Sequence, residues 1–228
     1  MSLGHSPSIV TSGLILCLDA ANVKSYPGSG TSWTDLSKNV NNTTLINGPT
    51  YNSSNGGSLV FNGTSQYGQT PSLITPSTGP FSVSMWYKLS GQGRGGLFER
   101  SFTLFNGMSF GQGGNSDWAF NVASTAGFTN GLSLVVTYPT IGIWYYDVGI
   151  YNGTNNLLFY RNGIQIGSLT GNTQGNLDSA GTRTNMLIFY RGDSFLPGNV
   201  SNINIYNRAL SATEVAQNFN ALRGRYGL

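Results

Sequence analysis

The chain has 228 residues, which is enough for a single domain with a substantial core. Only 8% of the residues are charged, whereas 39% are apolar and 12% aromatic, so glycine, serine, threonine and asparagine must supply most of the surface. That composition is typical of many short strands joined by tight turns. The 11 basic and 8 acidic residues form no run of like charge, so we expect no nucleic-acid partner.

The N-terminal region carries no sign of a targeting segment. Met1–Pro7 lacks a basic stretch, and the apolar run Leu14–Leu18 is too short for a signal sequence or a membrane span, so we expect neither. Residues 1–12 are predicted to form a polar N-terminal arm that becomes ordered on assembly, followed by a single domain over residues 13–228. Cys17 stands between two leucines, which indicates an inert buried thiol.

Segments with period-two alternation, separated by turn residues, follow one another along the chain and predict β-strands. The predicted strands are Gly13–Asp19, Ser58–Phe61, Phe81–Leu89, Gly96–Arg100, Asp117–Val122, Leu132–Thr137, Trp144–Tyr151, Leu157–Arg161, Met186–Tyr190 and Val200–Tyr206. Alternation places three residues on one face of the third of these strands: Phe81, Val83 and Met85.

Two local patterns predict particular connections. Asn162-Gly163 lies between two apolar runs and predicts a type I′ hairpin, because both residues tolerate a positive φ. The segment before Ser58 is predicted to be a long irregular loop, since residues 26–30 cannot sustain a β-ladder and residues 39–44 are almost all polar. Trp33 and Leu45 are expected to pin this loop to the domain.

One helix is predicted, close to the C-terminus. Ser211 and Glu214 form a capping-box pattern, in which the serine accepts a hydrogen bond from the third helical N–H. Gly224 is expected to end the helix. Three residues fall on its apolar face: Val215, Phe219 and Leu222.

The chain resembles the concanavalin A-like, laminin-G-like jelly-roll domains over about residues 13–228. The tracts that carry the resemblance are Gly13–Asn22 with Ser25–Gly30 and Trp33–Ser37, Ser58–Thr64, Phe81–Lys88, Tyr151–Thr154 with Tyr160–Gly163, Ser201–Ser211 and Gly224–Leu228. The resemblance implies an all-β fold, a two-sheet antiparallel jelly-roll sandwich with one short C-terminal helix. Domains with such an Arg-Tyr-Gly tail are similar to those of tailed bacteriophages, which implies a virion protein made in the host cytoplasm.

Familiar routes of catalysis have few candidate residues in this sequence. Glucanases of this fold place two carboxylates across the scissile bond, typically from one E-x-D-x-x-E strand, and no two acids here lie within five positions of each other. A pair from separate strands, such as Glu99 with Asp117, remains open. The lone His5 falls in the predicted arm, which leaves the core without a histidine for a nucleophilic centre. We therefore predict that the chain is not an enzyme.

The resemblance also raises a structural calcium site, the one cofactor considered. Related domains often hold calcium with loop acids, and Asp19 and Asp35 stand where such ligands occur. The acids that would complete the set are replaced by Asn62, Asn152 and Ser201-Asn202. Asp35 is therefore interpreted either as a calcium ligand or as an Asx-turn cap, and the second interpretation is favoured.

Carbohydrate binding needs aromatic platforms for apolar sugar faces, with amide or carboxylate groups beside them for hydroxyls. Two clusters fit this pattern: Trp118 with Asn115 and Asp117, and Trp144–Tyr146 with Asp147. The alternative is that these rings fill the core, as most tryptophans of a sandwich do. Arg223, Arg225 and Tyr226 likewise predict either a cap on the helix end or an interface with a neighbouring subunit.

Two functions follow for a virion protein with these features. One is a host-recognition module of a tail or fibre, with host-surface carbohydrate as its ligand. The other is a capsid decoration or cement protein whose partners are other virion proteins, with oligomers open in either case. Copy number per virion would separate them, because decoration needs dozens to hundreds of copies.

Overall fold

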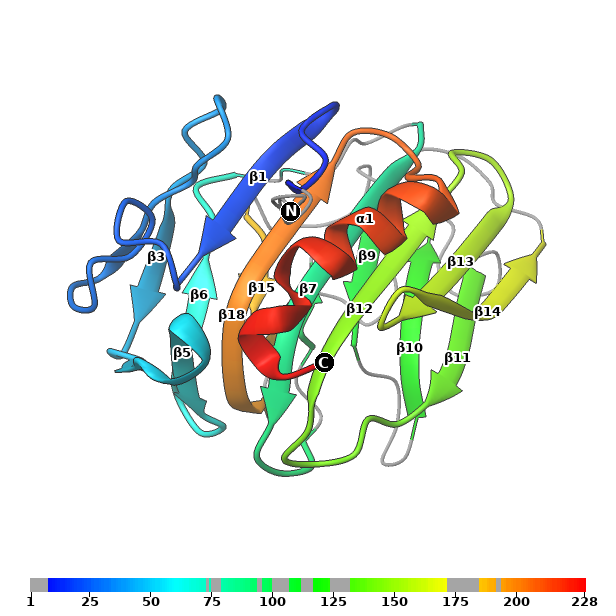
Figure 1. Ribbon diagram of the computed structural model, residues 1–228. Coiled ribbons are helices and arrows are strands. Elements are labelled where there is room, and N and C mark those ends of the chain that lie inside the picture. The colour runs from blue at the N-terminus through cyan, green and yellow to red at the C-terminus, as the bar shows by residue number, and fades with distance from the viewer. Residues whose placement is uncertain are drawn as a thin grey trace.

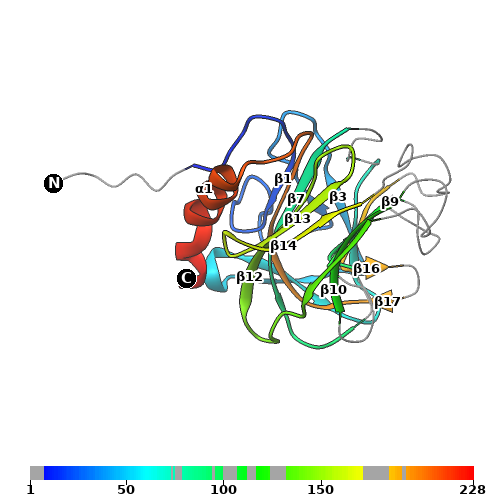
Figure 2. The ribbon, with the colours of Figure 1, turned by 90° about the vertical axis from the view of Figure 1, so that its right-hand side faces the viewer.

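The computed structural model describes residues 8–72, 74, 79–93, 96–99, 107–111, 117–123, 132–171, 185–191 and 194–228. Within them, two antiparallel sheets pack face to face and a C-terminal helix crosses the outer side of one sheet (Figure 1 and Figure 2). The predicted jelly-roll sandwich with one short helix is thereby confirmed.

The larger strands form the sheet that lies under the helix, here called sheet A. In spatial order it contains β14 (Ile164–Thr170), β13 (Asn156–Arg161), β12 (Trp144–Tyr151), β7 (Phe81–Leu89), β18 (Pro197–Tyr206), β5 (Ser58–Asn62) and β4 (Thr50–Asn52), with β1 (Leu14–Asp19) also paired to β18. Figure 1 shows this sheet in front, with α1 lying across β7 and β12.

The second sheet, sheet B, is built from shorter strands. Its order is β11 (Leu132–Thr137), β10 (Asp117–Ala123), β9 (Gly107–Phe110), β8 (Phe98–Glu99), β15 (Leu187–Ile188), β6 (Tyr67–Gln69), β3 (Thr43–Ile46) and β2 (Ser32–Trp33). A separate hairpin joins β16 (Tyr190–Arg191) to β17 (Ser194–Phe195). In Figure 2 sheet B and this hairpin lie on the side away from α1.

The main core lies between the two sheets. Phe81, Val83 and Met85 of β7 point into it and are completely buried, as their alternation predicted. Sheet B contributes one inward residue at the same level from each of six strands, with Gly68 of β6 between the first two, and all six are buried: Leu45, Ile188, Phe98, Phe110, Phe120 and Leu134. Burial of this much apolar surface is the main stabilising term of the fold.

The predicted connections are present, with one difference in extent. Asn162 and Gly163 both have positive φ, 50° and 82°, and join β13 to β14 as a hairpin. The segment before Ser58 is not wholly irregular, because β2, β3 and β4 lie within it. Their two to four residues are too short to produce a readable alternation. Trp33 and Leu45 are buried in the core, as expected.

Helix α1 (Ala212–Leu222) begins at the predicted capping box. Ser211 Oγ accepts from the Glu214 backbone N–H at 3.3 Å, and Glu214 Oε2 accepts from the Ser211 N–H at 2.9 Å. The α-helix ends at Leu222, two residues before Gly224, close to the predicted stop, but Gly224 is not left-handed and the chain continues as a 3-10 turn, Arg223–Tyr226. The left-handed residue that ends it is Gly227, with φ 74°. A second 3-10 turn spans Ser54–Gly56.

Candidate functional site

Trp118 lies inside the sandwich. Its ring is completely buried against Tyr87, and its Nε1–H donates to Asp147 Oδ2 at 3.0 Å. Strand β10 points Trp118 inward because the residues on either side of it, Asp117 and Ala119, occupy the outward positions of the pleat. A sugar platform needs an exposed ring face, so this position fits the core interpretation of Trp118 and not the ligand-binding one.

Asp147 is the centre of a buried polar cluster that the sequence did not reveal. Its two carboxylate oxygens accept from Tyr87 Oη at 2.7 Å, from Arg161 Nε at 2.9 Å and from Arg161 Nη2 at 2.8 Å. Burial raises the pKa of Tyr87 well above its ordinary value, and the Asp147 charge raises it further. Burial by itself lowers the pKa of Arg161, but the hydrogen bonds and the ion pair to Asp147 outweigh it, so the pKa lies above its ordinary value. Both carboxylate oxygens of Asp147 are thus occupied by donors of the chain itself, which is typical of a structural cluster.

Trp144 and Tyr146 lie on the outward face of sheet A, beneath the helix and the tail. Tyr146 is completely buried, and Trp144 is 8% exposed. The Trp144 Nε1–H donates to Asn55 Oδ1 at 3.2 Å, and its ring packs on Tyr226 with centroids 4.7 Å apart. Both rings therefore hold the chain's own C-terminal segment, and neither has an open face for a ligand.

The tail residues divide between packing and exposure. The Tyr226 ring stacks on Trp86, with centroids 4.1 Å apart and planes 16° from parallel. Arg225 Nη1 lies 2.9 Å from both oxygens of Asp19. Arg223 is exposed, with its guanidinium over the Phe219 ring. Tyr226 and Arg225 thus close the tail onto its own domain, while an interface role for Arg223 stays a prediction.

The two acids considered as calcium ligands are occupied by hydrogen bonds. Asp35 Oδ1 accepts from the backbone N–H groups of Cys17 and Ser37, each at 2.8 Å. Its Oδ2 accepts from the Asn41 N–H at 2.9 Å and from Ser37 Oγ at 2.7 Å. Asp19 is engaged by Arg225 and by the Ala21 N–H. The geometry of Asp35 is that of the Asx-turn cap. Among the described residues no three acids, cysteines or histidines cluster as a metal site would require.

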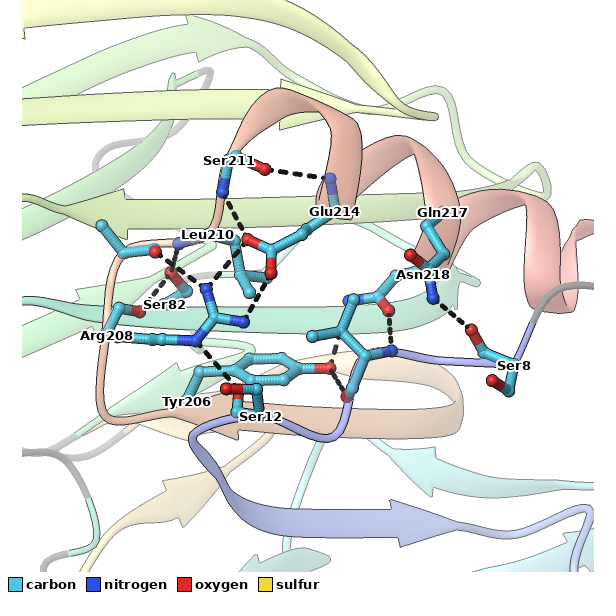
Figure 3. Close-up of polar contacts among 12 residues, drawn as sticks. Ser8, Ser12, Ser82, Tyr206, Arg208, Leu210, Ser211, Glu214, Gln217 and Asn218 are labelled. Atoms are coloured by element: carbon cyan, nitrogen blue, oxygen red, sulfur yellow. Dashed lines mark hydrogen bonds and ion pairs between the residues drawn. The ribbon is translucent and has the colours of Figure 1, made fainter.

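The described part of the N-terminal arm is tied to α1 and to β18 (Figure 3). The Val10 N–H donates to Asn218 Oδ1 at 2.7 Å, and Tyr206 Oη donates to the Val10 carbonyl at 3.0 Å. Arg208 Nε donates to the Ser12 carbonyl at 3.0 Å. Residues 8–12 therefore belong to the packed structure of the domain, although they were predicted as part of an arm. Residues 1–7, with His5, lie outside the described residues.

The remaining predicted residues are Asp117, Asn115 and Glu99, and only Asp117 has a described side chain. Asp117 is exposed at the start of β10 on the outward face of sheet B. Asn115 lies outside the described residues, as does the side chain of Glu99. No bonding can be assigned to these two, so their predicted roles stay predictions.

The outward face of sheet B carries five uncharged polar residues at one level of its strands, here called the polar row. Strand pairing places Thr44 opposite Gln69, and it places Asn121 between Ser109 and Ser133. Two paired positions, the buried Leu187 and the acid Glu99, lie between Gln69 and Ser109 and interrupt the row. Thr44 and Ser133 are exposed, and the other three members are half-buried: Gln69, Ser109 and Asn121.

Two features fix the geometry of the polar row. Asn121 Nδ2 donates to Ser109 Oγ at 3.0 Å, which orients both side chains. The buried inward residues of the same strands hold the backbone behind it. The sequence does not reveal the row, because β3, β6 and β9 are too short to show an alternation of polar and apolar residues.

The family model described as the concanavalin A-like lectin/glucanases superfamily matches residues 62–216, more than half of the chain. The chain belongs to this superfamily. A search of curated proteins found no significant match. In this concanavalin A-like chain, no helix within the described ranges has the length and hydropathy to cross a membrane.

Several solved structures are similar to this concanavalin A-like domain. The binding domain of Paraclostridial Mosquitocidal Protein 1 matches with a TM-score of 0.73 and 16% identity, over 92% of this chain and 52% of that one. The botulinum neurotoxin DC binding domain in complex with SialylT gives 0.69 and 14%, over 93% and 52%. The chain thus spans about half of these toxin domains.

Another similar structure is of comparable length to the concanavalin A-like chain. It is domain 4 of AbnA, a GH43 extracellular arabinanase from Geobacillus stearothermophilus, in complex with arabinotriose. It matches with a TM-score of 0.67 and 16% identity, over 91% of this chain and 98% of that one. At these identities the likeness establishes the fold, and the similar structures are binding domains or ancillary domains.

Proposed function

We propose that this chain is a non-catalytic, lectin-like domain that binds glycan through the outward face of sheet B. The observation that carries the proposal is the polar row. Its hydroxyl and amide groups both donate and accept hydrogen bonds, as sugar hydroxyls do, and they stand on a sheet whose other face is packed. A rigid sheet holds such groups in place with little ordering cost on binding.

The similar structures support a glycan as the ligand. AbnA domain 4 is in complex with arabinotriose, and the neurotoxin DC domain is in complex with SialylT. This chain matches 98% of AbnA domain 4 but only 52% of the neurotoxin domain, so the first is the more direct support. At 14–16% identity the shared fold does not determine the ligand. The glycan proposal therefore rests on the polar row, and these structures support it by showing glycan complexes of similar domains.

The engagement of the described acids supports the non-catalytic part. A glycosidase needs two carboxyl groups roughly 5–9.5 Å apart at an accessible surface. Asp19, Asp147 and Glu214 are each paired with an arginine, and Asp35 is held by four donors. Asp117 is the exposed acid of this set. Turnover of a glycan, lost on Asp117→Asn, would contradict this part.

We place the domain in a bacteriophage tail or fibre, as a host-recognition module. Support comes from the sequence resemblance and from the position of the chain ends. Ser8 is bound by Gln217 of α1, and the C-terminus lies on the same side, so both described ends lie opposite sheet B (Figure 2). Attachment through either end would leave sheet B facing outward. A copy number of hundreds per virion would favour the decoration role instead.

The test is binding of the purified chain to a printed glycan array. Gln69→Ala with Asn121→Ala should weaken binding at least about tenfold, because two hydrogen bonds worth about 1 kcal/mol each are removed. The matched control is Gln217→Ala with Asn220→Ala, which removes the same two chemistries from α1 and should bind as the wild type does. Absence of any bound glycan, or equal loss in both double variants, would overturn the proposal.

A further inference from the structure

Three partly exposed aromatic rings meet on the outward side of sheet B. They come from three elements, β6, β16 and β17, and are here called the aromatic cluster: Tyr67, Tyr190 and Phe195. Tyr67 stacks on Tyr190 with centroids 5.0 Å apart and planes 27° from parallel. Phe195 lies 4.6 Å from Tyr190 and 6.2 Å from Tyr67, measured between ring centroids. Each ring retains exposed surface, unlike Trp118 and Tyr146.

An irregular backbone position brings Tyr190 to this side. Ile188 points inward and is buried, so regular alternation would send Phe189 outward and Tyr190 inward. Phe189 instead has a φ of 60° and is also buried in the core, where its ring packs on Phe61 with centroids 5.0 Å apart. The alternation is therefore shifted by one residue, and Tyr190 leaves the sheet on the side of Tyr67.

The conformation of Phe189 is costly for a residue with a Cβ atom. A left-handed backbone brings the Cβ atom of a bulky residue close to the neighbouring carbonyl oxygen, and such positions gather at functional sites. Two hydrogen bonds hold it in place: the Phe189 N–H donates to the Leu97 carbonyl at 3.2 Å, and the Leu196 N–H donates to the Phe189 carbonyl at 3.0 Å. The fold thus contains a destabilising backbone conformation at the position that brings the aromatic cluster together.

The aromatic cluster adjoins the polar row. Tyr67 and Gln69 are two residues apart on β6, with the inward-facing Gly68 between them, so they share the outward face about 7 Å apart. Gly68 is tightly packed, since an added Cβ would lie 3.2 Å from the Ile188 side chain. Rings and hydrogen-bonding groups therefore stand side by side on one strand.

We infer that the aromatic cluster is the stacking platform for the C–H face of a pyranose ring, with Gln69 bonding hydroxyls at the ring edge. This inference rests on the proposed glycan-binding function. The negative face of an aromatic ring attracts the positively polarised C–H hydrogens of a sugar, and a ring with partial exposure excludes water from that contact. A protein-docking patch would need contiguous apolar surface. Among the described residues the large exposed aliphatic side chains belong to other segments, and of these Val135 lies on the outward face of sheet B, on β11 beside Ser133: Val23, Leu36, Val40, Val135, Ile141, Ile143, Ile164, Ile166 and Leu228.

The experiment compares four variants on an array of pyranose-containing oligosaccharides. Tyr67→Leu and Tyr190→Leu keep apolar bulk but remove a ring, and each should weaken binding at least about tenfold. Tyr67→Phe keeps the ring and should bind within about twofold of the wild type. The matched control is Tyr51→Leu, which removes a partly buried tyrosine of β4 in sheet A that packs on Tyr26.

Saturation-transfer NMR on the strongest array glycan gives an independent readout that does not depend on a variant folding. Saturation should be largest on the ring C–H protons of one sugar face. Wild-type binding that survives in both leucine variants, or saturation spread evenly around the sugar, would overturn the stacking platform and leave the glycan-binding function standing. Absence of wild-type binding to every array glycan would overturn both.

Discussion

The two outward faces of the sandwich differ in whether other segments of the chain cover them. Sheet A is covered by segments from both ends of the chain: residues 8–12, α1 and the 3-10 turn Arg223–Tyr226. Its aromatic rings pack against these covering segments, as Trp86 does against Tyr226 with ring centroids 4.1 Å apart. Sheet B has the polar row and the aromatic cluster on its outward face, with partly exposed members in both.

The difference teaches that aromatic content alone does not locate a sugar site. Trp144 and Tyr146 belong to an aromatic-rich segment of the sequence, yet they serve the contact between sheet A and the tail. The described part of the face assigned to glycan presents tyrosines, uncharged polar groups and Asp117. What decides the role of a ring is which face of which sheet it occupies, and whether another part of the chain covers it.

The comparison is tested most severely by two aspartates, one inside the sandwich and one on the face. Asp147→Asn should lower the free energy of unfolding by about 3–5 kcal/mol, because the buried Arg161 guanidinium loses its counter-charge. Asp117→Asn, at the exposed position on sheet B, should change it by less than about 0.5 kcal/mol. Denaturant unfolding measures both, and an Asp147→Asn protein as stable as the wild type would disprove the structural role of the cluster.

Closure of sheet A predicts the next largest effect. Tyr226→Ala should cost about 3 kcal/mol, because the ring that packs on Trp86 and Trp144 is lost from a buried position. Leu228→Ala, two residues on and 42% exposed, is the control and should cost less than about 0.5 kcal/mol. Equal melting temperatures for wild type and Tyr226→Ala would mean that the tail does not seal this face in solution.

Acid should loosen the helix that covers sheet A. The bonds from Arg208, with those from Ser211, lower the pKa of Glu214 to about 2. Because this folded value lies below the unfolded one of about 4.3, the stabilisation is complete above roughly pH 4.5 and is lost as the pH falls toward 2. The pair is partly exposed and screened, so the loss should be about 1 kcal/mol.

The matched variant for this pH effect is Glu214→Gln. Glutamine preserves the capping box but carries no charge, so its melting temperature should fall less between pH 5 and pH 2 than that of the wild type. The expected difference is about 2–4 °C in thermal melts. Parallel pH curves for the two proteins would contradict the assigned ion pair.

The smallest effect is expected from a chelator. All four donors to Asp35 belong to the protein, so EDTA should leave the melting temperature unchanged, and added calcium should do the same. Asp35→Ala, by contrast, should lower the free energy of unfolding by about 2 kcal/mol, because the buried N–H of Cys17 loses its hydrogen-bond acceptor. A melting temperature that falls with EDTA and recovers with calcium would restore the metal interpretation of Asp19 and Asp35.

The features that sequence predicted correctly are local ones. The hairpin at Asn162-Gly163 and the capping box at Ser211 depend on a few neighbouring residues, and both are present in the structure. The long strand Phe81–Leu89 carries enough alternating residues for its faces to be assigned. Patterns of this kind are fixed by backbone preferences and by period, which need no knowledge of distant segments.

The features that sequence missed depend on contacts between distant segments. The polar row draws one residue from each of five short strands, and no single strand reveals it. The aromatic cluster depends on the left-handed Phe189, which breaks the predicted strand Met186–Tyr190 in two. The direction of Trp118 could have been read from the alternation of β10, but the partner that explains it, Asp147, is 29 residues away.

Chemical-shift mapping on isotope-labelled protein tests the central claim most directly. Titration with the strongest array glycan should shift the backbone amides of Tyr67, Gln69 and Tyr190, and should leave those of Trp144, Phe219 and Tyr226 unchanged. That result would place the ligand on the outward face of sheet B. Shifts confined to α1 and the tail would contradict the account, because they would place the glycan on the face that the chain's own ends close.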